Sequence, residues 1–327
     1  MLALGRWTLG GIAVGLLSGA VAAPRFAQQA TTESAVPSDE VFLTAYRQAN
    51  PLVDWPLKTL LHHIPELRHL KPSADQSALP QILARVGENS RLFVANSLNT
   101  TSVETIDQSR TFGPTLTRRV TVTVTRKFHY LMVVKADPRP GFSALDEYRT
   151  GLRGGRRGYE TGSQGFFATK GFASMPLAFS LQTQPHSTFR YLGTEVVGKR
   201  RLEVVAFSNH AERSGVMGVF IDGGLRVPLL IQGVAWIDPA NYQIEQMRTD
   251  LLAPQPSIQL EGITTKVQFQ AVNFRTAGSV LWLPKEVNVT VYWGEITYSN
   301  RHRYKNYQLF RVDTRQDLEA PKPPSGP

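Results

Sequence analysis

The feature that most constrains the fold is an unbroken alternation of side-chain types in the stretch RRVTVTVTRKFHYLMVVK. From Val120 to Val134 every even-numbered position is apolar except Arg126, whereas threonine and basic residues fill much of the odd-numbered set. A period of two without glycine or proline predicts a single strand. At about 3.3 Å per residue this strand would extend for about 50 Å, longer than a flat, compact sheet usually offers. The sequence therefore predicts a sheet that curves.

The C-terminal half continues with the same period. Seven further strands are predicted, over Thr188–Val197, Arg201–Phe207, Val234–Ile237, Tyr242–Leu251, Ile263–Arg275, Glu286–Trp293 and Ile296–Val312. Turn-forming residues separate several of them, as at Gly198-Lys199 and Gly294-Glu295. Because the connections are short and no helical pattern intervenes after about residue 185, neighbouring strands should be antiparallel.

Three helical segments are predicted before the strands. Ser38 is a suitable N-cap, and the acidic residues that follow it favour the start of a short helix. A second short helix is expected between Trp55 and His63. From Leu79 to Val94 the apolar residues keep to one helical face, and Pro80 lies in the first turn, where its missing N–H costs little. This last segment should be the longest helix.

The first 22 residues have the pattern of a secretory signal. A single charge at Arg6 precedes an apolar run from Trp7 to Val21, and small residues follow. An anchoring helix is the alternative, but the run is shorter than the ~20 apolar residues that a membrane span needs. We therefore expect a periplasmic or secreted protein. The chain contains no cysteine, which excludes disulfides, a thiol nucleophile and a lipid-modified cysteine.

The chain divides into five expected segments. These are a signal peptide at 1–22, a linker at 23–37, an N-terminal helical segment at 38–98, a curved antiparallel sheet domain at 99–318 and a disordered tail at 319–327. The sheet domain contains an insertion at about 150–182, made of a loop rich in glycine and arginine and an apolar segment, Phe166–Gln182. A chain of 327 residues can bury a sizeable core without metals or crosslinks.

The formal net charge is +10, or +9 once Arg6 is removed with the signal. Such an excess favours anionic partners, such as an anionic membrane surface, although a basic surface without a dedicated partner is the alternative. Basic side chains share one face of the last predicted strand, at Arg301, Arg303, Lys305 and Arg311. This row is either a solvated outer face or a rim that contacts lipid headgroups.

No motif predicts catalysis, a metal or a cofactor. The glycine- and arginine-rich loop lacks the spacing of a phosphate-binding fingerprint, so we expect a solvated loop and no nucleic acid partner. His62, His63 and His69 lack an HExxH arrangement. There is no GxSxG elbow, and acidic residues are scattered singly. The sequence therefore favours a protein that is not an enzyme, although absent motifs do not exclude one.

The stretch VAWIDPANYQIEQMR predicts a hairpin with a tight turn at Asp238-Pro239-Ala240-Asn241. Val234 and Trp236 share one parity on the first strand, and Tyr242 and Ile244 share one on the second. Contacts between such side chains across the strands would fix the register. The residues either pack the core or line an apolar concavity that holds a ligand.

This hairpin, together with LWLPKEVNVTVYWG and NRHRYKNYQLF, resembles a group of exported bacterial proteins related to the lipoprotein-localisation carriers, the LolA/LolB-like superfamily. The resemblance covers roughly Ile82 to Val312. It implies an α+β fold class: a strongly curved antiparallel β-sheet, an open half-barrel, with helices packed on its concave face. Members of the group with known roles bind acyl chains or lipoproteins, or sense them, in an apolar cleft.

We therefore expect a soluble, monomeric carrier that binds a lipid, an acyl chain or a lipidated protein. The residues expected to line the cleft are Val122, Val124, Phe128, Tyr130, Met132, Trp236, Val289, Val291 and Trp293, with Phe166, Phe167, Phe172 and Met175 as a lid. Two alternatives remain open. One is an envelope sensor or protein-interaction module whose core is filled, and the other is an enzyme of unknown chemistry.

Overall fold

The structure is a computed structural model that describes residues 16–17, 39–96, 99–112, 120–136, 143–152, 166–212, 218–222, 225–275 and 278–310. The predicted signal segment apart from Leu16–Leu17, the linker, most of the glycine- and arginine-rich loop and the tail lie outside the described residues.

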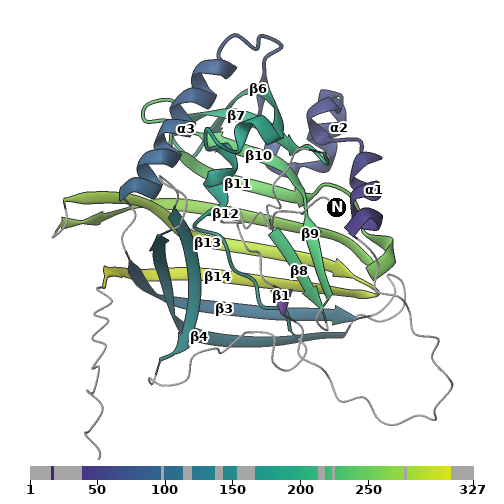
Figure 1. Cartoon of the computed structure of the whole chain (residues 1–327). Coiled ribbons are helices and arrows are strands. Elements are labelled where there is room, and N and C mark those ends of the chain that lie inside the picture. Colours follow the sequence, from purple (N-terminus) through teal and green to yellow (C-terminus); the bar gives the residue numbers. More distant parts are fainter. Residues whose placement is uncertain are drawn as a thin grey trace, which may run out of the picture.

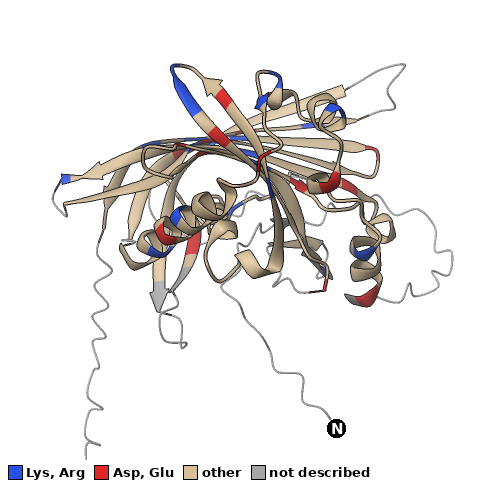
Figure 2. Cartoon of the chain, turned by 90° about the horizontal axis from the view of Figure 1, so that it is seen from above, with Lys and Arg blue, Asp and Glu red and all other residues tan. Residues whose placement is uncertain are grey.

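One large antiparallel sheet dominates the fold (Figure 1). In spatial order its eleven strands are β2 (Lys71–Pro72), β6 (Ser187–Val197), β7 (Arg200–Asn209), β10 (Ile231–Ile237), β11 (Ile244–Leu251), β12 (Leu260–Phe274), β13 (Ser279–Trp293), β14 (Ile296–Leu309), β3 (Thr100–Phe112), β4 (Val120–Ala136) and β5 (Ser143–Gly151). The predicted long strand is confirmed as β4, which has 17 residues. The sheet is visibly bowed when it is seen from above (Figure 2).

The remaining elements are short or helical. The helices are α1 (Asp39–Arg47), α2 (Leu57–His63) and α3 (Leu79–Asn96), with 3-10 turns η1 (Leu52–Asp54), η2 (Pro65–Leu67), η3 (Met175–Phe179), η4 (Gln184–His186) and η5 (Pro256–Ile258). The three helices lie where the sequence predicted them. β1 (Leu16–Leu17), β8 (Gly218–Asp222) and β9 (Leu225–Leu229) form a second, small sheet. No helix among the described residues is both long enough and apolar enough to cross a membrane.

The two faces of the sheet carry separate apolar clusters, and β7 contributes to both. Val205 and Phe207 belong to the larger cluster, which includes residues of α1, α3, β8 and β9; we call this side of the sheet the inner face. Val204 points to the opposite side, where it packs with Leu60 of α2. Since α2 and α3 cover opposite faces, the expected packing of helices on the concave face alone is not confirmed.

The predicted hairpin is formed by β10 and β11, with Val234 opposite Arg248 and Trp236 opposite Gln246. The turn is held by Asp238, whose carbonyl oxygen accepts from the Tyr242 N–H at 2.7 Å. Trp236 is fully buried, packs in the cluster that contains α2, and donates its indole N–H to Glu195 at 2.7 Å. The tryptophan of this hairpin therefore stabilises the contact between the sheet and α2.

Gly193 allows the edge strand β2 to approach β6. It has a φ of +124° at a bulge in β6, and a Cβ atom at this position would fall on the carbonyl oxygen of Lys71. Substitution Gly193→Ala is expected to lower the free energy of unfolding by about 1 to 3 kcal/mol, measured by urea denaturation, because strain and crowding add.

Gly198→Ala is the matched control, since Gly198 also has a positive φ of +64° but nothing lies within 4 Å of its Cβ position. Gly198→Ala should lower the free energy of unfolding only by the strain of a non-glycine residue at a positive φ. Equal losses in the two variants would show that the approach of β2 does not depend on Gly193.

Candidate functional site

The inner face is covered by a segment that we call the strap, Phe166–Gln182, which connects the region after β5 to β6. Phe166, Phe167, Phe172 and Met175 are at most 3% exposed. The ring of Phe167 lies 4.4 Å from that of Tyr298 and 5.4 Å from that of Trp293, between centroids. The strap, predicted to be a lid, is therefore itself part of the core.

The structure brings most of the predicted lining residues together but not all of them. Tyr130, Met132, Val289, Val291, Phe167, Phe172 and Met175 belong to the inner-face cluster, and Trp293 packs against it. Phe128 and Phe166 are buried outside that cluster. Val122 is 37% exposed and Val124 is half-buried, near the other end of β4. Trp236 lies on the opposite face of the sheet, because it is paired with Val204 across β10 and β7 and both side chains point to the same side.

A polar network crosses this apolar face where β3, β4, β5 and β14 meet. Arg149 donates to both oxygens of Glu104, at 2.5 and 2.8 Å. His302 lies between Glu104 and the strap, with its Nδ1 2.8 Å from Glu104 Oε1 and its Nε2 2.8 Å from Thr169 Oγ1. The side chains of Glu104 and His302 are fully buried and that of Arg149 is 8% exposed. The network thus links three strands to the strap.

The protonation states follow from the partners. Burial by itself would raise the pKa of Glu104, but the charge of Arg149 and the hydrogen bonds from His302 and Arg149 outweigh it and lower that pKa to about 2. Burial lowers the pKa of His302, against the opposing effect of Glu104. Because ionised Glu104 can only accept, Nδ1 of neutral His302 carries the proton and Nε2 accepts from the Thr169 hydroxyl.

Further polar contacts hold the strap to the sheet. Glu147 of β5 accepts from the backbone N–H groups of Gly171 and Ala173, at 2.6 and 3.0 Å. Burial raises the pKa of Glu147, and these two hydrogen bonds oppose that shift. Asn300 and Gln108 donate to the carbonyl oxygen of Phe167, at 3.0 and 2.9 Å. The first part of the strap, from Phe167 to Ala173, is therefore fixed by side chains from the sheet.

The order of Thr169, His302 and Glu104 is that of a hydroxyl, a base and an orienting carboxylate, which is the arrangement used in nucleophilic catalysis. Thr169 and His302 have no exposed surface, however, so a substrate cannot reach the hydroxyl in this conformation. Neither His302 nor Glu104 was singled out from the sequence. The arrangement acts here as a structural attachment for the strap.

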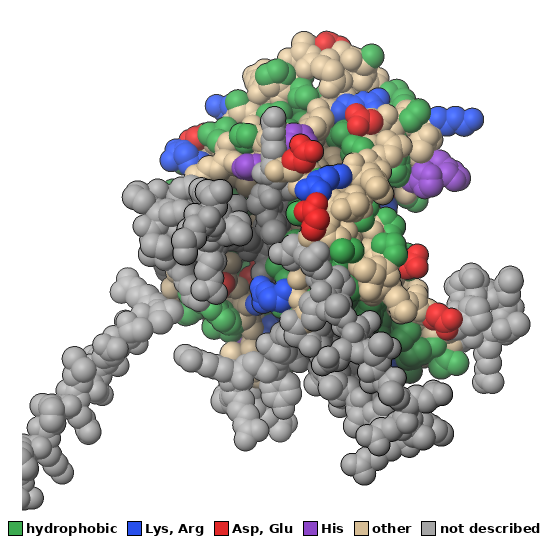
Figure 3. Space-filling model, turned by 45° about the vertical axis from the view of Figure 1, so that its right-hand side comes forward, with side chains coloured by type: hydrophobic (Ala, Val, Ile, Leu, Met, Phe, Trp, Pro, Cys, Tyr) green, Lys and Arg blue, Asp and Glu red, His purple; other side chains and the backbone are tan. Residues whose placement is uncertain are grey.

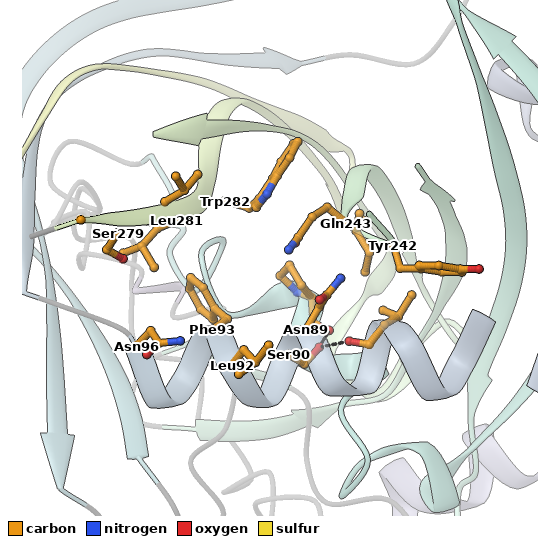
Figure 4. A pocket seen from close by; sticks show the side chains of 15 residues that line it. Asn89, Ser90, Leu92, Phe93, Asn96, Tyr242, Gln243, Ser279, Leu281 and Trp282 are labelled. Carbon is orange, nitrogen blue, oxygen red and sulfur yellow. Dashed lines mark hydrogen bonds between the residues drawn. The ribbon is translucent and has the colours of Figure 1, made fainter. Parts of the chain in front are cut away.

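Two pockets open on the surface. The larger has a volume of about 420 Å³ and lies between α3, residues 242–244 and residues 278–282 (Figure 4). The smaller, of about 340 Å³, lies at Phe112, Gln259 and the turn between β13 and β14. Sequence reasoning did not single out the larger pocket, because its walls come from a helix and two strand ends that are distant in sequence.

The basic row predicted on the last strand is partly neutralised. Arg301 pairs with Glu286 at 2.9 Å, and Arg303 pairs with Asp107 at 2.5 Å; Arg311 lies outside the described residues. Figure 3 likewise shows acidic and basic side chains interspersed on the face that it presents. These pairs favour a solvated outer face for the row. Among the described residues, no group of three or more His, Asp and Glu side chains could hold a metal ion.

These features define a class: a single large curved antiparallel sheet whose apolar inner face is covered by insertions and helices of the same chain. No family model matches the sequence, and no curated protein matches it.

Similar solved structures include a DUF1329 family protein from Desulfovibrio piger ATCC 29098, with 11% identity, a TM-score of 0.35 and coverage of 70% of this chain and 90% of the other. A putative outer membrane lipoprotein-sorting protein domain from Vibrio parahaemolyticus has 10% identity and a TM-score of 0.35, over 72% and 93% of the two chains. The LolA superfamily protein NE2245 from Nitrosomonas europaea has 9% identity and a TM-score of 0.29, over 70% and 94%. Two of these three neighbours carry names of the lipoprotein-sorting or LolA group, which is the group that the sequence resembles, and none of them assigns a residue of this chain a role.

Proposed function

We propose that the chain is a soluble, exported, carrier-like protein of the bacterial envelope that binds the acyl chain of a lipid or lipidated protein on its inner face when the strap moves aside. The observation that supports this most is that the apolar inner face is covered by a separate segment rather than by a second large sheet. Phe167 and Phe172 would leave, and an acyl chain would replace them. Export rests on the predicted signal segment.

The energy balance allows such an exchange. Each buried CH₂ group contributes about 0.8 kcal/mol, and a buried phenylalanine side chain contributes about 1.5 to 3 kcal/mol. An acyl chain of about ten CH₂ groups therefore supplies about 8 kcal/mol, which exceeds the contribution of the two rings. The four hydrogen bonds to Gly171, Ala173 and Phe167 would have to break, at about 1 kcal/mol each, so the gains and losses of the exchange are of similar size.

Polar groups are available for the other end of a lipid. The buried hydroxyls of Thr100, Tyr130 and Tyr304 have no hydrogen-bond partner among the described residues. They lie on the inner-facing sides of β3, β4 and β14, and the two tyrosine rings are 5.0 Å apart between centroids. Hydroxyls of this kind can donate to ester or carboxyl oxygens, which would satisfy buried groups that otherwise cost free energy.

Mass spectrometry of organic extracts from natively purified protein, together with the uptake of a fluorescent fatty acid, tests this function. The variant Glu147→Gln should increase the rate of uptake several-fold, because an amide oxygen replaces the two carboxylate oxygens that hold Gly171 and Ala173. Glu261→Gln, at an exposed position of β12, is the matched control and should leave uptake unchanged. The function is ruled out if no lipid is extracted from the natively purified protein and if neither this protein nor the two variants take up the fatty acid saturably.

The second candidate is an envelope sensor or protein-interaction module with a filled core. The burial of the strap favours it, since Phe167, Phe172 and Phe179 already occupy the inner face. In that case the Gly171 and Ala173 amides should exchange with solvent as slowly as those of β12 and β13, and added fatty acid should not change their exchange rates. A carrier should show faster exchange in the strap when fatty acid is added.

A further inference from the structure

The larger pocket differs from the inner face in the polar character of its lining, although its walls include Val86 and Leu281 of the inner-face cluster and Pro176 of the strap. Its floor is α3, and its other walls are the start of β11 and the start of β13 (Figure 4). Its volume of about 420 Å³ lies within the range of small-molecule sites. The side chain of Asn89 donates to the carbonyl oxygen of Asn241 at 2.7 Å and so fixes α3 against the β10–β11 turn. The pocket is therefore formed before any ligand arrives.

None of the described residues that line this pocket carries a charge. Its polar side chains are amides and hydroxyls, and several have no hydrogen-bond partner among the described residues: Asn96, Gln243 and Ser279. In Figure 4 the amide of Gln243 points into the space between Trp282 and α3. Neutral donors and acceptors with unused capacity suit a neutral ligand that carries several hydrogen-bonding groups.

Aromatic side chains supply the apolar part of the lining. Trp282 extends from β13 and Phe93 rises from α3, so the two rings approach the space from opposite walls (Figure 4). The indole N–H groups of Trp55, Trp236 and Trp293 each donate to a protein oxygen. That of Trp282 has no such partner among the described residues, and it is thus available to a ligand.

Other ligand classes fit this lining less well. An acyl chain would leave the half-buried amide of Gln243 without solvent or a partner, which costs about 1 to 3 kcal/mol. An anionic headgroup or a phosphate would find no cation among the described lining residues. A ligand that is neutral, rich in hydroxyls and flat enough to stack on an aromatic ring meets all the conditions.

We propose that the pocket between α3 and β13 is a binding site for a neutral saccharide, with Trp282 as the stacking surface and the amides of Gln243 and Asn96 as hydrogen-bonding groups. The rim is rigid on one side. Tyr242 is held at a φ of +57°, and the guanidinium of Arg85 lies 5.4 Å from the centre of its ring. This left-handed backbone places Gln243 at the wall of the pocket.

Isothermal titration calorimetry of the full chain with maltotriose, cellotriose and triacetylchitotriose tests the site. We expect saturable binding of at least one of them with a dissociation constant of about 1 mM or lower. Trp282→Ala should weaken binding at least tenfold, and Gln243→Ala should weaken it about two- to tenfold. The matched control is Gln268→Ala, an exposed glutamine on β12 away from the pocket, which should bind as the unchanged protein does.

Several results would overturn the proposal. The first is that none of the three sugars binds saturably at concentrations up to about 10 mM. The second is that sugar binding is unchanged in both pocket variants. The third is that palmitate or adenosine displaces the sugar. Because Gln243 is in a turn and is half-buried, Gln243→Ala keeps the test valid if Trp282→Ala does not fold. Sugar binding and fatty-acid uptake are measured by separate experiments, so this site and the carrier function can fail separately.

Discussion

Replacement of Arg149 by methionine is expected to lower the free energy of unfolding by about 3 to 5 kcal/mol. Arg149 is the cation that offsets the buried charge of Glu104, and both groups lie in a region where their side chains are at most 8% exposed. Without Arg149 the carboxylate must either stay charged without a cationic partner or take up a proton. Protonation of Glu104 would also weaken the hydrogen bond from His302 and thereby the attachment of the strap.

Urea denaturation at pH 7 measures this loss, and two further variants identify its cause. Arg301→Met breaks an ion pair whose arginine is 52% exposed, so it should cost about 1 kcal/mol or less. The double variant Glu104→Gln/Arg149→Met removes both charges and should recover most of the stability lost in the single variant. If Arg149→Met costs no more than Arg301→Met, the network does not stabilise the fold.

The parts of the fold that sequence reasoning predicted are those set by local patterns. The alternation from Val120 to Val134 predicted β4, and the apolar spacing after Leu79 predicted α3. The pairing of β14 with β3 joins Arg301 to Asp107, nearly two hundred residues apart, and no local pattern encodes such a partnership. The short strand β2 was also missed, because two residues show no period.

The side of the sheet to which a side chain points, and what covers that side, was harder to predict than the strand that contains the residue. Parity places Val234 and Trp236 on one side of β10, but it cannot say that α2 rather than the strap covers that side. On β3 the buried set includes Ser102, Glu104 and Gln108, which a polar-outward reading would assign to solvent. The network with His302 was therefore invisible in the sequence, since its partners come from separate strands.

The apolar composition of the strap did not predict where the strap lies relative to the sheet. Its phenylalanines were expected to cover a cleft from outside, and apolar content alone is compatible with that. The buried side chains of Glu147, Gln108 and Asn300 hold its backbone against the sheet instead. Buried polar groups need partners, and a segment without regular secondary structure offers free backbone N–H and C=O groups that supply them.

Stability should fall as the pH is lowered from 7 to 3, mainly because of Glu104. Its pKa in the folded protein is about 2, below the ordinary value of 4.5, so its contribution is fully present above the ordinary value and is lost as the pH falls toward the folded one. A tenfold change in proton affinity corresponds to about 1.4 kcal/mol, so the whole contribution is roughly 3 kcal/mol. The pKa of His302 is also lowered, from an ordinary value of 6.5, so His302 too makes the protein less stable as the pH falls below 6.5.

Glu147 opposes this trend, because its raised pKa makes the folded state bind the proton more tightly, and its contribution is present at low pH and lost as the pH rises. Urea denaturation at intervals between pH 7 and 3 measures the sum. Glu104→Gln should give a flatter profile below pH 5 than the unchanged protein, whereas Glu147→Gln should give a steeper one. A Glu104→Gln profile as steep as that of the unchanged protein would mean that the acid sensitivity comes from other carboxylates, and that the ion pair with Arg149 does not set the pKa of Glu104.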